Sequence, residues 1–238
     1  MDDGTKGDDL LLWVDLETTG TDLLEDEIIE IGCIVTDRQL DKLFEYQAVI
    51  KPSDKGMGRL MLNPVVREMH TKNNLIGDII EERTGGNCLQ VTQDLTGMLE
   101  REFPGRRFIV AGSGVGPFDR PFINIHMPLL ARLCRYYVFD VSVIRRAMTL
   151  FAGEDWLAPA QGNEQTAPWE SHRALADIRV ALDEARDYKA LWDVTFNKDD
   201  EEPKRDEEEP ADPDSLALAF DAYMQKWRTI AGEFLRKL

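Results

Sequence analysis

The positions of apolar residues in the first part of the chain predict three β-strands joined by short turns. Apolar residues alternate or dominate along three segments, and polar or acidic stretches separate them. Short connections favour antiparallel pairing of neighbouring strands. We therefore expect an antiparallel meander formed by Leu10–Leu16, Ile28–Thr36 and Leu43–Lys51.

The middle of the chain mixes helical and strand-like patterns. In the longer segments apolar residues recur at spacings of three and four, and two short apolar runs are typical of buried strands. Helices are expected over Pro64–Met69, Leu75–Glu82, Leu89–Phe103, Pro117–Leu133, Val141–Phe151 and Ser171–Trp192, strands over Phe108–Ala111 and Tyr137–Phe139, and a loop over Gly153–Pro168. This order of elements favours an α/β fold, a mixed β-sheet with helices on both faces.

An acidic stretch and an amphipathic helix follow the predicted α/β domain, which we assign to residues 1–196. Residues 197–214 contain three prolines and ten acidic residues, so we expect a flexible linker. Residues 215–238 place apolar side chains at spacings of three and four, as in an amphipathic helix. Three partners for its apolar face are open: the chain's own α/β domain, a second copy in a homodimer, or another protein.

Two acidic residues interrupt the first apolar segment. Asp15 and Glu17 are separated by one residue, so on a strand their side chains point to the same face. Neighbouring carboxylates at a buried strand end repel each other and lose hydration. A divalent cation bound through carboxylate oxygens relieves both costs. The alternative is a strand end that carries two solvated acids.

Further acidic residues and a histidine complete a candidate catalytic set. Asp119 follows a glycine-rich run, and His172 and Asp177 lie near the start of the predicted long helix. In such sets, carboxylates hold two cations about 3.5–4 Å apart that stabilise the attacking and leaving oxygens of phosphodiester hydrolysis. A histidine exchanges protons near neutral pH and can act as the general base. For Asp177 the alternative is a plain surface acid on an exposed helix face.

Five short segments carry a resemblance to a known enzyme family. They are residues 13–20, 28–31, 69–75, 139–142 and 172–179. Each segment alone is weak evidence for a family, but the order of the five segments and their near-family spacing are specific. Through them the chain resembles the DEDDh 3′→5′ exonuclease superfamily and, within it, most of all the oligoribonuclease family. The resemblance covers the whole predicted catalytic domain and implies an RNase H-like fold of the DnaQ-like exonuclease type.

The resemblance also implies roles for the catalytic set. By similarity, Asp15 would bridge two divalent cations, Glu17 and Asp177 would complete the tighter site, Asp119 would support the second cation, and His172 would be the general base. The implied cations are Mg²⁺, for which Mn²⁺ can substitute. The implied reaction is hydrolysis that releases nucleoside 5′-monophosphates from the 3′ end of short single-stranded RNA.

Four residues are candidates for substrate binding by the same resemblance. Thr18 and Gly20 lie in the first shared segment, and His70 lies in a segment that resembles a substrate-contacting loop. Tyr136 precedes another shared segment, where an aromatic residue of oligoribonucleases reaches across a homodimer to the partner's substrate. Ordinary strand or core packing is the alternative for Tyr136. For His126, within a predicted helix, a structural role is the better interpretation.

Three features depart from the oligoribonuclease pattern. The glycine-rich run before Asp119 is one residue longer, has Ser113 where the family usually has Asn, and ends in a Phe118–Asp119 pair similar to that of proofreading exonucleases. Thr21 stands where the family usually has a Leu that wedges between bases, and the chain carries a C-terminal extension. A single-stranded DNA 3′–5′ exonuclease is therefore the main alternative. A binding module without activity is a second one, which the complete catalytic set argues against.

The composition limits the partners and the compartment of this chain. Its 238 residues carry a formal net charge of −17, which argues against long nucleic-acid polymers because phosphate contacts need cationic partners. No apolar stretch approaches the ~18 residues of a membrane span, and the acidic N-terminus is unlike a signal peptide. Cys33, Cys88 and Cys134 lack metal-ligand spacing. We therefore expect a cytoplasmic protein with reduced thiols and no membrane contact.

Overall fold

A computed structural model describes residues 10–152 and 173–196 of the chain. The chain divides into two compact units, residues 1–184 and 185–238, and the described part of the second is the end of one helix. The predicted loop at 153–168, His172, the acidic linker and the C-terminal helix lie outside the described residues. Among the helices that are described, none is long and apolar enough to cross a lipid bilayer.

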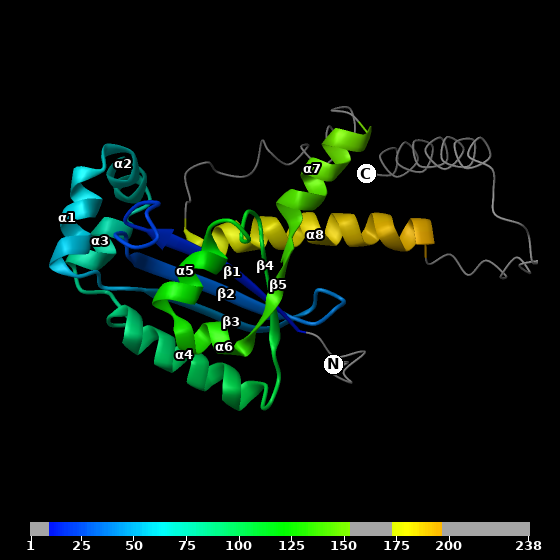
Figure 1. Cartoon of the computed structure of the whole chain (residues 1–238), viewed down its shortest axis with the longest axis horizontal. Helices are drawn as coiled ribbons and strands as arrows, with labels where there is room; N and C mark the ends of the chain where they lie inside the picture. Colours follow the sequence, from blue (N-terminus) through cyan, green and yellow to red (C-terminus); the bar gives the residue numbers. More distant parts are fainter. Residues whose placement is uncertain (1–9, 153–172, 197–238) are drawn as a thin grey trace, which may run out of the picture. The chain divides into compact units, whose positions relative to one another are not determined.

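Within the described residues, five strands form one mixed sheet (Figure 1). The strand order is β3-β2-β1-β4-β5. The first three strands form the expected antiparallel meander, and β4 and β5 run parallel to β1. The strands are β1 (Leu10–Thr18), β2 (Ile28–Thr36), β3 (Lys42–Val49), β4 (Phe108–Gly112) and β5 (Cys134–Asp140). The α/β fold predicted from the order of elements is confirmed.

The two faces of β1 have different neighbours because its side chains alternate with a period of two. Leu12, Val14 and Leu16 are buried in the main apolar core. Residues of three helices complete that core: α4 (Cys88–Glu102), α5 (Asp119–His126) and α6 (Pro128–Leu133). Asp15 and Glu17 project from the opposite face of the strand. This alternation places the acidic pair of the sequence away from the apolar core.

Helix α8 (Ala174–Phe196) begins against the face of the sheet that carries the acidic pair. Gly32 on β2 is the register partner of Asp15, and a Cβ atom added to Gly32 would lie 2.9 Å from the carbonyl carbon of Ala174. Only a residue without a side chain allows this close approach of helix and strand. The first turn of α8 is thereby brought onto the strand pair β1–β2.

Three short helices follow the meander, and the first of them was not predicted from the sequence. They are α1 (Asp54–Leu62), α2 (Pro64–Lys72) and α3 (Leu75–Ile80). Ser53 caps α1 by accepting a hydrogen bond from the amide of Gly56, and Asn63 caps α2 in the same way through the amide of Val66. Two glycines in α1 weaken its intrinsic helix propensity, which explains why its pattern was missed.

The single helix predicted over Pro117–Leu133 is wrong, because the structure contains two helices there. Helix α5 ends at His126, and Pro128 occupies the first turn of α6. Between them Met127 has φ −126° and ψ 56°, outside the helical region, as expected for a residue that precedes proline. Strand β5 also begins three residues before the predicted segment, and it leads into α7 (Val141–Ala152).

The close contact at Gly32 makes a stability test possible. We expect Gly32→Ala to lower the free energy of unfolding by about 1–3 kcal/mol, because the new methyl group overlaps the backbone of Ala174. The matched control is Gly58→Ala in α1, where an added Cβ meets nothing within 4 Å. There the substitution should stabilise the protein by about 0.4–1 kcal/mol. Urea unfolding followed by circular dichroism measures both, and equal effects would contradict the packing argument.

Candidate active site

Three carboxylates from two distant parts of the chain meet at the β1–α8 contact. One ligand oxygen each from Asp15, Glu17 and Asp177 lies within 4.8 Å of the others. Asp15 and Glu17 leave the same face of β1, and Asp177 lies in the first turn of α8. Glu17 is buried, and the other two are partly buried. The structure thus brings together three of the four acids that the sequence proposed as metal ligands, and Asp177 is not a plain surface acid.

Asp119, the fourth predicted acid, lies at the first position of α5 and is 4% exposed. Its Oδ1 accepts a hydrogen bond of 2.9 Å from the backbone amide of Leu16. Leu16 stands between Asp15 and Glu17, so this bond ties Asp119 to the edge of the cluster. The charge of Asp119 contributes to raising the pKa of both strand acids.

Burial and mutual repulsion make the ionised cluster costly. Burial, followed by the neighbouring charges of Asp119, Glu17 and Asp177, raises the pKa of Asp15 well above its usual value. Burial and then the charge of Asp177 raise the pKa of Glu17 to about 9. Burial also raises the pKa of Asp119 to about 7, against the opposing effect of the hydrogen bond from Leu16. A donor set of anionic oxygens that repel one another fits a hard divalent cation.

The segment after Glu17 is braced by side-chain hydrogen bonds. Thr18 Oγ1 donates to the carbonyl oxygen of Gly20 at 2.6 Å, and Thr19 Oγ1 donates to Asp26 at 2.9 Å. Arg59 of α1 donates twice to Asp26, at 2.6 and 3.0 Å, and this pairing lowers the pKa of the Asp26 carboxyl group. The segment that contains the predicted substrate residues Thr18 and Gly20 is therefore held in one conformation. Their contact with substrate stays a prediction.

The two described histidines occupy different surroundings. His70 on α2 is fully buried, and its Nε2 lies 3.3 Å from the carbonyl oxygen of Thr18 and 3.7 Å from Glu17 Oε2. It therefore contacts a ligand of the cluster, and its predicted contact with substrate stays a prediction. His126 Nε2 lies 2.9 Å from the carbonyl oxygen of Leu23, and its ring stacks on Phe122 at 5.5 Å. These contacts agree with the structural role expected for His126.

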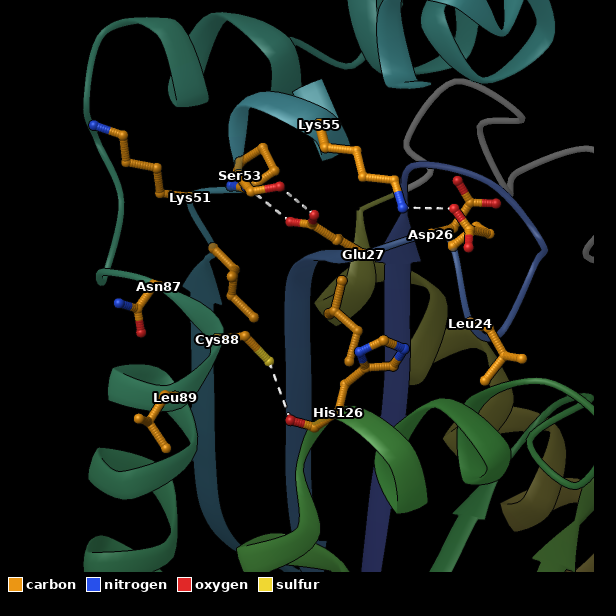
Figure 2. Close-up of a pocket in the computed structure, with 14 residues that line it drawn as sticks. Leu24, Asp26, Glu27, Lys51, Ser53, Lys55, Asn87, Cys88, Leu89 and His126 are labelled. Atoms are coloured by element: carbon orange, nitrogen blue, oxygen red, sulfur yellow. Dashed lines mark hydrogen bonds and ion pairs between the residues drawn. The ribbon is translucent and has the colours of Figure 1, made fainter. Parts of the chain in front are cut away.

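The structure also contains a pocket of about 600 Å³. Its lining residues are drawn in Figure 2. It is lined by the segment 24–28, the chain before and at the start of α1, the start of α4, and His126. Several of its charged groups have partners within the protein: Lys55 pairs with Glu25 at 2.6 Å, and Glu27 accepts hydrogen bonds from the amide and the hydroxyl group of Ser53. None of the four predicted metal ligands lines this pocket, so the chemistry argued from the cluster does not involve it.

Comparison with known proteins identifies the family. Residues 12–70 match the exonuclease family model RNase_T. Over 185 residues the chain is 34% identical to an oligoribonuclease of Streptomyces griseus, an alignment that covers 76% of this chain and 85% of that protein. It is also 28% identical over 197 residues to the mitochondrial oligoribonuclease of Homo sapiens, covering 82% and 77% of the two chains. The chain belongs to the oligoribonuclease family.

Solved structures support the same fold for this oligoribonuclease-family chain. The exonuclease I of Methylocaldum szegediense matches with a TM-score of 0.54 and 19% identity, covering 79% of this chain and 43% of that one. A product-bound exonuclease I matches with a TM-score of 0.53 and 17% identity, and this chain spans only 46% of its length. The predicted RNase H-like exonuclease fold is confirmed. Family membership likewise confirms the prediction of a 3′–5′ exonuclease, a phosphodiester hydrolase.

A further carboxylate organises the loop that leads to Asp119 in this family member. Asp140, at the end of β5, accepts hydrogen bonds from the amides of Gly114 and Gly116 at 2.9 and 3.2 Å. It also accepts bonds from the amide and the hydroxyl group of Ser142, at 3.0 and 2.7 Å. Despite the opposing effect of burial, these bonds lower the pKa of Asp140. The sequence marked residues 139–142 only as a shared segment, without a role for the carboxylate.

The raised pKa of Glu17 predicts how the stability of the metal-free protein depends on pH. Its folded-state pKa of about 9 exceeds the ordinary value of 4.5, so the unfolded chain releases this proton first. The contribution of Glu17 to stability is full below pH 4.5 and is lost as the pH rises through 9. We therefore expect the melting temperature of wild type, minus that of Glu17→Gln, to fall between pH 5 and pH 9 in EDTA.

Thermal melts followed by calorimetry in a pH series provide this measurement. Saturating Mg²⁺ should raise the wild-type melting temperature most at the alkaline end of the series, because the cation binds the ionised carboxylate. The Glu17→Gln variant is the matched control, since its amide does not titrate. If the two proteins gave parallel profiles in EDTA, Glu17 would not titrate in the range that its surroundings predict.

Proposed function

We propose that this protein is a 3′–5′ exoribonuclease that degrades short oligoribonucleotides to nucleoside 5′-monophosphates with two divalent cations. The observation that carries the proposal is the cluster of Asp15, Glu17 and Asp177, whose ligand oxygens lie within 4.8 Å of one another, with Asp119 bonded to its edge. Relatives named oligoribonuclease support the substrate class, among them the Streptomyces griseus protein. Mg²⁺ is the expected cation, with Mn²⁺ as a substitute.

In this proposal, some residues of the chain bind the cations and another accepts a proton. Asp15, Glu17, Asp119 and Asp177 would hold the two cations through carboxylate oxygens. Bound cations lower the pKa of water and stabilise charge on the attacking and leaving oxygens. His172, which lies outside the described residues, would accept the proton of the attacking water. The buried surroundings of the carboxylates strengthen each of these electrostatic interactions.

Charge and exposed aromatic residues support a short substrate. With a net charge of −17, the chain offers few cationic groups for a long phosphate backbone. Tyr136 on β5 is 90% exposed, which argues against core packing, and its ring lies edge-on to Tyr137 of the same strand with centroids 5.0 Å apart. An exposed ring can stack on a base, and we propose this contact for Tyr136, within one subunit or across a homodimer. Stacking would compensate for Thr21 at the position where the family usually has Leu.

The first test of the proposal compares substrates. We expect the fastest cleavage on 5′-labelled RNA of two nucleotides, slower cleavage of RNA of twenty, and slower still of single-stranded DNA of either length. Asp15→Asn should lower kcat/KM by more than 100-fold, since loss of an outer-shell contact already costs about 10–100-fold at metal sites. Gel analysis with Mg²⁺ or Mn²⁺ measures both effects.

Glu68→Gln on α2 is the matched control for this test, because Glu68 is exposed and pairs with Lys72 one turn along the same helix. It should keep wild-type activity. Preference for the long DNA would favour the single-stranded DNA exonuclease instead. That alternative is motivated by the Phe118–Asp119 pair. No metal-dependent cleavage of any substrate would leave a binding module as the better interpretation.

The role proposed for Tyr136 has its own test. Tyr136→Ala should raise KM for the RNA dinucleotide by roughly 5- to 150-fold, the equivalent of about 1–3 kcal/mol of base stacking, while kcat changes little. Tyr136→Phe keeps the ring and should keep the wild-type KM. Steady-state kinetics separate the two constants. An unchanged KM in the alanine variant would remove Tyr136 from the substrate site.

A further inference from the structure

A fifth carboxylate lies next to the catalytic cluster without being one of its predicted ligands. Glu30 on β2 is 0% exposed and is the register partner of Glu17, so it shares the face of the sheet that carries the cluster. Its negative charge contributes to raising the pKa of Asp15 and Glu17. A buried charge in this place aggravates the repulsion, so its presence requires a separate physical reason.

The hydrogen bonds of Glu30 supply that reason. Arg173 Nε donates to Oε1 at 2.9 Å, and Arg173 Nη2 lies 2.7 Å from the same oxygen. The backbone amide of Ala174 donates to Oε2 at 3.1 Å, and Gln47 Nε2 donates to Oε1 at 2.9 Å. Both carboxylate oxygens are therefore engaged by donors from this chain. Glu30 thus binds the start of α8 twice, through the side chain of Arg173 and through the backbone amide of Ala174, the first residue of the helix.

The opposite side of the same guanidinium group contacts a different helix. Arg173 Nη1 donates to Asp78 Oδ2 of α3 at 2.9 Å and lies 3.4 Å from the carbonyl oxygen of Asn73. Asp78 also accepts two hydrogen bonds from Arg83, at 2.6 and 3.0 Å. One planar side chain thus joins β2, α3 and the beginning of α8, which a lysine ammonium group could not do with the same geometry.

Arg173 also begins the helical turn that contains the ligand Asp177. Its carbonyl oxygen accepts hydrogen bonds from the amides of Ala176 and Asp177, at 2.8 and 3.2 Å. The side chain of Arg173 therefore fixes the rotation of the first turn of α8 about its axis, while the contact at Gly32 fixes its distance from the sheet. Rotation of this turn would carry the Asp177 carboxylate away from Asp15 and Glu17.

We propose that Arg173, clamped between Glu30 and Asp78, is a positioning residue that sets Asp177 in place for binding the catalytic cation. This proposal rests on the proposed function, because it concerns the same carboxylate cluster. Arg173 acts through the backbone of its own helical turn and contacts neither substrate nor cation.

The experiment measures Mn²⁺ binding to the full chain by isothermal titration calorimetry without nucleic acid. We expect Arg173→Gln to weaken Mn²⁺ binding by about 10–100-fold, the usual effect of losing an outer-shell partner of a metal ligand. On the RNA dinucleotide, kcat should fall while KM stays within about twofold. The Mn²⁺ affinity and kcat of Arg173→Lys should lie between those of wild type and Arg173→Gln. Lysine can pair with Glu30, but it lacks the planar guanidinium group that binds both carboxylates.

The matched control is Arg145→Gln. Arg145 of α7 donates to Glu184 of α8 at 2.8 Å, so the control also removes a guanidinium–carboxylate pair that holds this helix. It should leave Mn²⁺ affinity and kcat unchanged. Wild-type Mn²⁺ affinity and kcat in Arg173→Gln, with or without a lower melting temperature, would reduce the clamp to a merely structural ion pair and overturn the proposal.

Two provisions keep the test decisive. If Arg173→Gln does not fold, Asp78→Asn keeps the Glu30 pair and weakens the contact of Arg173 with α3, together with the two bonds from Arg83. Asp78→Asn should also weaken Mn²⁺ binding, by a smaller factor than Arg173→Gln. Unchanged Mn²⁺ affinity in both Asp78→Asn and Arg173→Lys would overturn the proposal. Because the titration needs no substrate, a wild type that binds Mn²⁺ but cleaves neither RNA nor DNA would refute the proposed function and leave the positioning test intact.

Discussion

Repulsion among the carboxylates that meet between β1 and the first turn of α8 is the constraint on which the rest of this structure depends. The ionised forms of these carboxylates repel one another, as the raised pKa values of Asp15 and Glu17 indicate. Without the surrounding fold they would move apart. The fold opposes that tendency from both sides. Apolar side chains of β1 anchor the strand in the core, and hydrogen bonds at the start of α8 hold the helix. Ligands held together in this way need little rearrangement to bind a cation.

Hydrogen bonds of two further acids hold the segments next to the cluster. The bonds of Asp26 brace the segment after Glu17, and the bonds of Asp140 brace the loop before Asp119. Neither acid belongs to the cluster, and both have a lowered pKa because donors surround them. Among the described residues, these acids therefore differ from those of the cluster in what surrounds them. Asp26 and Asp140 are surrounded by hydrogen-bond donors, whereas Asp15 and Glu17 face other carboxylates that raise their pKa.

Much of the fold could be predicted because local patterns determine it. A period of two on the first strand correctly placed Asp15 and Glu17 on one face, and the three-stranded meander followed from short connections. Helix boundaries that depend on a single residue were harder to predict. Pro128 divides a helix that the apolar pattern had joined, and the two glycines of α1 concealed a helix whose caps are favourable.

The candidate site was predicted as a set of residue types, and its supporting contacts were not. A resemblance in short segments identified the four acids, but nothing local in the sequence shows that Glu30 receives Arg173, which lies far along the chain. Such contacts arise from the crossing of α8 over the sheet, so only three-dimensional information reveals them. His172, predicted as the general base, lies outside the described residues and stays a prediction.

The distribution of the cluster along the chain has a consequence for the synthesis of the protein. Asp15 lies on the first described strand and Asp177 on the last described helix, and between them come all the other described strands. A growing polypeptide that has not yet reached α8 carries two strand acids without their third partner. Because the main apolar core includes no residue of α8, the strands can pair and that core can form while the two strand acids still lack Asp177.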